Sequence, residues 1–396
     1  MAGARATRPG PFRRSSLTTA LPTADQLTAA LSTVIDPEIR RPLTELGMVK
    51  SAEVSADGTA RIAIFLTVSG CPMKETLTKD VTAAVVRLDG VERVEVELDV
   101  MSSEQRQALQ TLLRGDKPVR DIPFALPGSL TRVFAVASGK GGVGKSSVTV
   151  NLAVAMAQQG RSVGVLDADI YGFSIPRMLG VTHRPTQVES MIMPPSAHGV
   201  KVISIGMFTK DNTPVVWRGP MLHRALEQFL ADVYWGDLDV LLMDLPPGTG
   251  DVAISVAQLV PSAEIVVVTT PQLAAQEVAE RAGAIALQTH QRIAGVVENM
   301  SYLECPHCAE RIDVFGTGGG QAVVSSLSQR LGADVSLLGQ VPIDVRLREG
   351  GDSGQPLVLS APEASASRAL LDITQALIGK PRGLAGMSLG LSPARR

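Results

Sequence analysis

The feature that most constrains this chain is a glycine-rich segment at residues 139–146, which reads Gly-Lys-Gly-Gly-Val-Gly-Lys-Ser. It follows an apolar run at residues 132–137 and precedes a helical pattern that ends at Gly160. This spacing and context are typical of a phosphate-binding loop between a strand and a helix. The glycines let backbone N–H groups turn inward around phosphates, and the helix N-terminus favours negative charge. The sequence therefore predicts a P-loop nucleotide site.

Further short apolar runs alternate with helical segments after this loop. Their hydrophobicity is continuous rather than alternating, which is typical of strands covered on both faces of a parallel sheet. We therefore predict an α/β fold with a doubly wound, mostly parallel sheet. The predicted strands are residues 132–137, 162–166, 200–205, 240–243, 265–269, 293–297 and 337–341.

The 396 residues are too many for one ordinary core, and a stretch rich in proline and glycine divides them. The pattern before this stretch is helix, extended segment, strand, helix and strand, which predicts a second, small α/β domain. The predicted parts are a disordered tail at 1–22, the small domain at 23–107, a linker at 108–130, the P-loop domain at 131–380 and a flexible tail at 381–396.

Net charge, apolar runs and cysteine content argue against several classes of function. The formal net charge of −2 offers no basic surface for nucleic acid, and no apolar run approaches the about 18 residues of a membrane span. Three cysteines form no disulfide framework, which fits a reducing compartment. We expect a cytoplasmic protein that binds neither nucleic acid nor membrane. The arginine-rich first residues also occur in transit peptides, but Pro9 and Pro11 favour a plain tail.

Carboxylates follow two of the predicted strands. Asp167 and Asp169 come after the second strand, and Asp244 comes after the fourth, with Asp251 close behind. Ligands of open α/β sheets bind beyond the carboxyl ends of strands, so these groups are expected at one site. We predict that Asp244 and Ser146 hold Mg²⁺ and that Asp169 positions the attacking water. Asp167 and Asp251 are either part of this site or carboxylates that merely cap strand ends.

The P-loop contains two lysines. Lys145 is expected to neutralise the β- and γ-phosphate oxygens. Lys140 is an additional cation, and the deviant P-loop class of MinD, ParA and the nitrogenase iron protein carries a lysine at this place. The resemblance implies that Lys140 reaches across a dimer to the partner's nucleotide, so that hydrolysis requires dimerisation. The alternative is a solvated lysine at the mouth of the loop.

Cys305 and Cys308 form a Cys-x-x-Cys pair in a loop that follows a strand expected to end at residues 299–301. A [4Fe–4S] cluster or an all-cysteine zinc site needs four thiolates, which a symmetric dimer of such pairs supplies. Redox pairs and plain buried cysteines share the same spacing. The pair alone therefore leaves metal and non-metal functions open.

Together these motifs resemble the Mrp-type (ApbC-like) iron–sulfur cluster carrier ATPases. The resemblance covers about residues 130–380, in segments 138–147, 167–176, 244–251, 298–308 and 348–352. It implies a homodimer that bridges a labile [4Fe–4S] cluster through Cys305 and Cys308 and delivers it, with ATP, to apo-proteins, with cluster scaffold proteins as further partners. It also implies that Asn299 recognises adenine. The expected nucleotide-binding residues are then Gly139, Lys140, Gly141, Gly142, Val143, Gly144, Lys145, Ser146, Ser147 and Asn299.

The small N-terminal domain resembles the iron–sulfur assembly domain often fused ahead of such proteins, through residues 36–38 and through Thr67, Cys71 and Pro72. Cys71 precedes a predicted helix and is either a thiolate of lowered pKa or an inert buried thiol. Ala309 departs from the glycine of many relatives, which is expected to change the turn but removes no ligand. The extra N-terminal cysteines of eukaryotic relatives are absent, so no second cluster is expected.

Two other functions fit parts of the pattern. A positioning ATPase like MinD or ParA shares the P-loop class, but the C-terminal tail shows no basic amphipathic helix for membrane binding. A metal-insertion ATPase would use Cys305 and Cys308 for another ion.

Overall fold

The computed structural model describes residues 21–67, 71–114, 121–126, 128–169, 172–208, 219–248, 250–272 and 275–379. Nearly all of the predicted N-terminal tail and the whole C-terminal tail lie outside these residues. The chain forms two compact units, residues 1–102 and 103–396, which are described separately.

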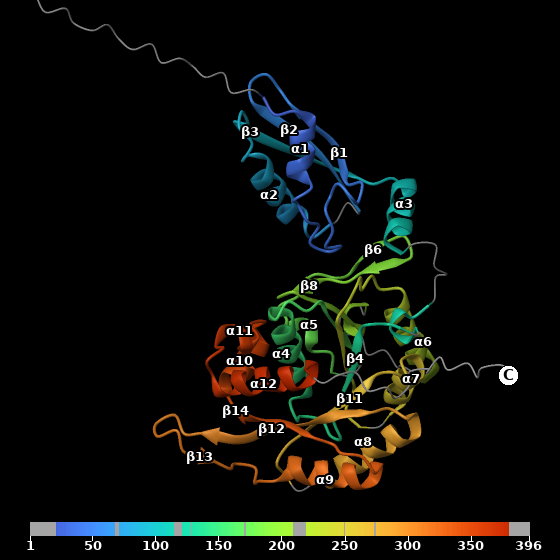
Figure 1. Cartoon of the computed structure of the whole chain (residues 1–396), viewed down its shortest axis with the longest axis vertical. Helices are drawn as coiled ribbons and strands as arrows, with labels where there is room; N and C mark the ends of the chain where they lie inside the picture. Colours follow the sequence, from blue (N-terminus) through green and yellow to red (C-terminus); the bar gives the residue numbers. More distant parts are fainter. Residues whose placement is uncertain are drawn as a thin grey trace, which may run out of the picture. The chain divides into compact units, whose positions relative to one another are not determined.

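In the part of the first unit that the structure describes, a three-stranded sheet is accompanied by two helices (Figure 1). Strand β1 (Val49–Val54) runs antiparallel to β2 (Thr59–Leu66), and β2 runs parallel to β3 (Arg93–Val100). Helix α1 (Ala24–Leu31) packs on β1 and on α2 (Lys74–Val85), which packs on β3. The predicted small α/β domain is confirmed.

The second unit begins with α3 (Ser103–Arg114), part of which we predict as linker. The helix continues through residues 108–114 because the glycine and proline residues of the linker begin only at Gly115 and because Leu109 is buried. Residues 108–114, which we predict as part of the linker, are thus helical, and the domain boundaries stay a prediction.

A nine-stranded sheet forms the centre of the second unit. Its strands are β4 (Arg132–Ala137), β5 (Val163–Asp167), β8 (Ser196–Ala197), β9 (Val200–Ser204), β10 (Val240–Asp244), β11 (Glu264–Thr269), β12 (Ile293–Glu304), β13 (Arg311–Ile312) and β14 (Leu337–Ile343). Their order is β13, β12, β11, β4, β10, β5, β9 and β8, and β14 also pairs with β12. Only β8 and β13 run antiparallel to their neighbours. The predicted mostly parallel sheet is confirmed, with β6 (Thr186–Val188) and β7 (Met191–Met193) as a separate hairpin.

Helices cover both faces of this sheet (Figure 1). One face carries α4 (Lys145–Gln158), α5 (Ile175–Met178), α10 (Val345–Ser353), α11 (Leu357–Ser360) and α12 (Ser365–Ile378). The other carries α6 (Gly219–Ala231), α7 (Asp251–Leu259), α8 (Ala275–Thr289) and α9 (Gly319–Leu331). The short helices η1 (Pro123–Ala125) and η2 (Ile205–Phe208) contribute Phe124 and Ile205 to the apolar core on that face.

Neighbouring residues of β4 explain the continuous hydrophobicity of the strands. Val133 and Ala135 belong to the apolar core under α6–α9, whereas Phe134 and Val136 belong to the core under α4 and α12. Both faces of the strand are thus buried, so residues 133–137 are all apolar. None of the helices among the residues that the structure describes is long and apolar enough to cross a membrane.

Strand β12 is longer than the sequence predicts. We expect its end at residues 299–301, but it continues to Glu304 and pairs with β13 through Leu303 and Glu304. The reason is tertiary: β13 is only two residues long and has no periodic pattern, yet it gives the end of β12 a hydrogen-bonding partner.

Candidate functional site

The P-loop joins the end of β4 to the start of α4. Gly142 and Gly144 have φ angles of 80° and 79°, a backbone conformation that side chains strongly disfavour. A Cβ atom on Gly144 would also collide with the side-chain amide of Asn299. Two of the predicted glycines are therefore required by backbone geometry, and one of them by the close approach of β12 as well.

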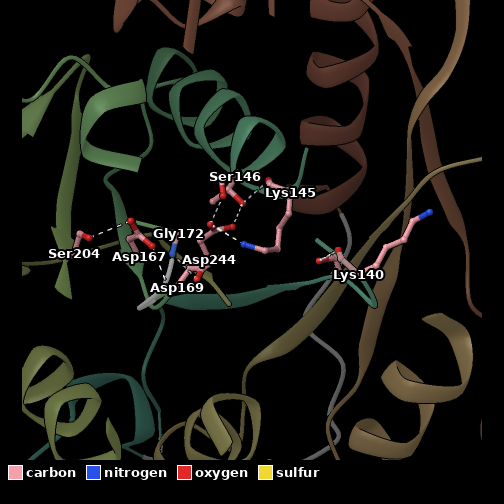
Figure 2. Close-up of polar contacts among 10 residues, drawn as sticks. Lys140, Lys145, Ser146, Asp167, Asp169, Gly172, Ser204 and Asp244 are labelled. Atoms are coloured by element: carbon pink, nitrogen blue, oxygen red, sulfur yellow. Dashed lines mark hydrogen bonds and ion pairs between the residues drawn. The ribbon is translucent and has the colours of Figure 1, made fainter. Parts of the chain in front are cut away.

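The carboxylate of Asp244, the last residue of β10, contacts polar side chains from the first turns of α4 (Figure 2). Ser146 Oγ donates a hydrogen bond of 2.6 Å to Asp244 Oδ2, and Lys145 Nζ lies 2.8 Å from the same oxygen. Thr149 Oγ1 donates a bond of 2.8 Å to Oδ1. The structure thus brings together the predicted Lys145, Ser146 and Asp244. It adds Thr149, which sequence reasoning missed because a threonine inside a helix carries no motif.

The donor set at this site fits Mg²⁺ and a phosphate. A serine hydroxyl and a carboxylate are the oxygen ligands that Mg²⁺ takes beside nucleotide phosphates. Lys145 is 6% exposed, so its charge is held inside the loop rather than in solvent. Ser146 and Asp244 would hold the ion, and Lys145 would face the phosphate oxygens.

Asp167 is the last residue of β5, which pairs with β10, and Asp169 follows it by two residues. Ser204 Oγ donates to Asp167 Oδ2 at 3.0 Å, and the Asp169 backbone N–H donates to Asp167 Oδ1 at 3.2 Å. Asp169 Oδ1 accepts the Gly172 N–H at 3.0 Å. Burial, together with the nearby charge of Asp244, raises the pKa of Asp167 to about 8. Asp167 therefore lies at the site, and the hydrogen bond that it accepts from the Asp169 backbone helps to hold Asp169 in position.

The side chain of Asp251, the fourth carboxylate named from the sequence, lies outside the described residues. Its place at the start of α7 is described, but its contacts are not.

Lys140 points away from the Asp244 cluster (Figure 2). Its Nζ atom donates to Gln272 Oε1, beyond the end of β11. Arg281 of α8 donates a hydrogen bond of 2.9 Å to the Gly139 carbonyl. Neither Gln272 nor Arg281 was foreseen, because their relation to the loop depends on the packing of distant segments. The trans role of Lys140 stays a prediction.

Asn299 closes the P-loop from β12. Its side chain is 2% exposed, and Nδ2 donates to the Val143 carbonyl at 2.9 Å. Its Oδ1 atom is buried without a hydrogen-bond partner among the described residues. Such an orphaned acceptor costs about 1–3 kcal/mol, and a donor such as the amino group of adenine would satisfy it. The role of Asn299 in recognising adenine stays a prediction.

The cysteine pair lies at the tip of the hairpin formed by β12 and β13. The Cys305 N–H donates to the Glu310 carbonyl, and the Ala309 N–H donates to the Cys305 carbonyl, both at 2.9 Å. Backbone N–H groups of His307 and Cys308 and the Cys308 thiol lower the pKa of Cys305. Cys308 is exposed, and Cys305 is partly so. The tip presents two accessible sulfur ligands on one turn, which is half of a four-thiolate site.

Ala309 adopts a backbone conformation that glycine takes up more readily. Its φ angle is 58°, in the left-handed region. This conformation costs a non-glycine residue about 1–2 kcal/mol. Whether Ala309 changes the turn relative to glycine-containing relatives stays a prediction.

Cys71 is a buried thiol. It is 5% exposed, and burial, with smaller contributions from Asp36 and Glu38, raises its pKa to about 11. Of the two expectations for this residue, the thiolate of lowered pKa is wrong. Its position before α2 does not offset the desolvation of the sulfur.

The sheet, the P-loop and the carboxylates at the strand ends define a P-loop NTPase. Residues 129–378 match the model of the NUBPL iron-transfer P-loop NTPases, within the ParA group. The match spans more than half of the chain, so the chain belongs to this family. Residues 24–98 match the model of iron–sulfur cluster assembly proteins.

Individual relatives extend the match to most of the chain. A protein from Mycobacterium bovis named "Iron-sulfur cluster carrier protein" is 67% identical over 93% of this chain and 96% of its own length. A protein of the same name from Synechocystis is 41% identical over 90% of this chain and 98% of its own length. A solved nucleotide-binding protein from Archaeoglobus fulgidus, in complex with ADP, is 38% identical with a TM-score of 0.50, over 59% of this chain and 90% of that one.

Gly144→Ala should abolish nucleotide binding, because the added Cβ meets the Asn299 amide and forces a positive φ on alanine. Gly160→Ala is the matched control: its φ is 79°, but no atom lies within 4 Å of the added Cβ. We expect the control to lose about 1–2 kcal/mol of stability and to bind nucleotide normally. Calorimetric titration with Mg²⁺ and ADP, with thermal melts, checks both; normal binding by Gly144→Ala would contradict the geometry.

Asp167→Asn should change the pH dependence of stability in the nucleotide-free protein. The folded pKa of Asp167, about 8, lies above an unfolded value of about 4. The folded state therefore holds an extra proton in this window, and the stabilising contribution is complete below about pH 4 and declines as the pH rises to about 8. Thermal unfolding midpoints at several pH values, without Mg²⁺, should show this decline in the wild type only. Identical slopes in the two proteins would refute the assignment.

Proposed function

We propose that this protein is an ATP-dependent iron–sulfur cluster carrier, which holds a labile [4Fe–4S] cluster as cargo between two copies of the chain and delivers it to apo-proteins. One observation carries the proposal: β12 joins the two sites. Its Asn299 donates a hydrogen bond to the P-loop, and the accessible Cys-x-x-Cys pair begins at Cys305, directly after the last residue of the strand. The names of the relatives support the same function.

The cysteine tip suits transient binding of a cluster. The lowered pKa of Cys305 favours the thiolate, which is the form that ligates iron. One copy offers two thiolates, and a two-fold dimer offers the four that a [4Fe–4S] cluster needs. Exposure of Cys308 lets an acceptor protein approach the cluster directly. We infer cluster scaffold proteins and apo-proteins as donors and acceptors in the cytoplasm.

The phosphate site suits ATP hydrolysis in a dimer. Ser146 and Asp244 would bind Mg²⁺, Lys145 would neutralise phosphate oxygens, and Asp169 would orient the attacking water. Lys140 points away from its own Asp244, so it is available to a second subunit after it leaves Gln272. A charge supplied in this way contributes roughly 10³-fold or more to related reactions.

Cys305→Ala and Cys308→Ala should each remove the cluster and leave nucleotide binding intact, because neither residue contacts the P-loop. Anaerobic reconstitution with iron and sulfide, followed by UV–visible and Mössbauer spectra and a mass determination, should give one [4Fe–4S] cluster per wild-type dimer. Cys71→Ala is the matched control and should keep the cluster, since its thiol is buried. A stable cluster in the Cys305, Cys308 double variant would exclude the shared site.

Lys145→Ala and Lys140→Ala should separate binding from turnover. Loss of Lys145 removes a buried charge from the phosphate site and should abolish productive ATP binding. Loss of Lys140 should spare binding and slow hydrolysis by roughly 10³-fold, because its charge would act on the partner's nucleotide. Nucleotide titration and steady-state phosphate release measure the two effects. Wild-type hydrolysis in both variants would rule out these roles.

A further inference from the structure

Strand β12 is interrupted at Met300, between the nucleotide-facing Asn299 and the cysteine hairpin. Met300 has a φ angle of 56°, which is uncommon outside glycine. Asn299 pairs with Val341, and the next pair is Leu303 with Ile343, so the chain advances four residues on β12 but two on β14. Bulges of this kind re-aim strands, and backbone strain of this kind collects at functional sites.

Two consecutive residues at this bulge touch the P-loop. Asn299 Nδ2 donates to the Val143 carbonyl, and the Met300 Cε atom lies 3.7 Å from the position of a Cβ on Gly144. Asn299 Oδ1 is the buried acceptor without a partner among the described residues. A nucleotide that fills the P-loop and engages this amide therefore acts directly on the bulge.

Glu298 holds the bulge from its other side. Its buried carboxylate accepts hydrogen bonds from Ser301 Oγ at 2.8 Å, from Gln340 Nε2 at 2.6 Å and from the Gly320 N–H at 2.5 Å. These donors belong to the bulge, to β14 and to the first turn of α9. A carboxylate that is 1% exposed is stable only while such donors surround it, so it ties the three elements together.

We propose that Glu298 is a positioning residue that fastens the Met300 bulge to the sheet, and that the bulge thereby connects the P-loop to the cysteine hairpin. Nucleotide at Asn299 shifts the bulge, and the strand that continues to Glu304 carries the shift to Cys305. The accessibility of the two thiols then depends on the nucleotide. This proposal rests on the proposed function, since it names how nucleotide binding acts on the cargo site.

The test is alkylation of the thiols in cluster-free, full-length protein. Iodoacetamide labelling of Cys305 and Cys308 is followed by mass spectrometry without nucleotide, with Mg²⁺ and ADP, and with Mg²⁺ and a non-hydrolysable ATP analogue. In the wild type we expect nucleotide to change the labelling rate by about fivefold or more, the lower end of ordinary coupling between sites. Cys71, whose pKa is raised to about 11, should stay unlabelled and serves as the internal control.

The Glu298→Gln variant should bind nucleotide and lose this response. Its side-chain amide carries an NH₂ donor, which would face the hydrogen-bond donors that now bind the carboxylate. Glu304→Gln is the matched control: it removes a charge next to Cys305, but its carboxylate bonds Ser365 and not the bulge. It should respond as the wild type does. If Glu298→Gln does not fold or does not bind nucleotide, Met300→Gly is the variant that tests the proposal. Glycine removes the backbone strain at the bulge, and this variant should also lose the response.

Three results would overturn the proposal: no nucleotide response in the wild type, a full response in both Glu298→Gln and Met300→Gly, or protection that follows only the fraction of dimer measured by light scattering in every variant. Because no cluster is present, these results are independent of cluster binding. Reconstitution of the cysteine variants tests the proposed function separately.

Discussion

The buried carboxylate of Asp244 is the interaction on which the phosphate site depends. It ends a strand that lies between β4 and β5, and it is fully shielded from solvent. Burial of a charge costs several kcal/mol unless partners compensate. Lys145, Ser146 and Thr149 provide that compensation, and all three belong to the first turns of α4. The contacts that stabilise the charge therefore also hold the P-loop in place.

The negative charge of Asp244 also acts on the neighbouring carboxyl group of Asp167. Asp167 lies opposite Asp244 in the parallel pairing of β5 and β10, so two carboxyl groups share a low-dielectric region. The field of Asp244 adds to desolvation and favours the protonated form of Asp167. A divalent cation at Ser146 and Asp244 would relieve this repulsion. Parallel pairing of strands that end in aspartate thus creates a site that attracts a cation.

Strand β12 links this site to the cysteines along a single stretch of backbone. Its first half lies between β11 and β14 inside the sheet, and its second half leaves the sheet as a hairpin with β13. Asn299 therefore lies on the strand that leads directly to Cys305, which follows its last residue, Glu304. The buried Glu298 and the strained Met300 lie where the pairing of β12 with β11 ends and before its pairing with β13 begins.

Local patterns in the sequence determined the doubly wound sheet and the P-loop, because double burial requires unbroken apolar runs and phosphate binding requires glycines at set spacing. They also named Lys145, Ser146 and Asp244, which the fold brings together. Tertiary structure alone decided the state of Cys71: its place before a helix suggests a low pKa, but burial, which depends on distant residues, raises it. Tertiary structure also decided the hydrogen bond from Thr149 to Asp244, which is 95 residues away, and the pairing of β12 with β13. The first contact joins residues that are remote along the chain, and β13, with two residues, is too short to show the period of a strand, so no local pattern records either.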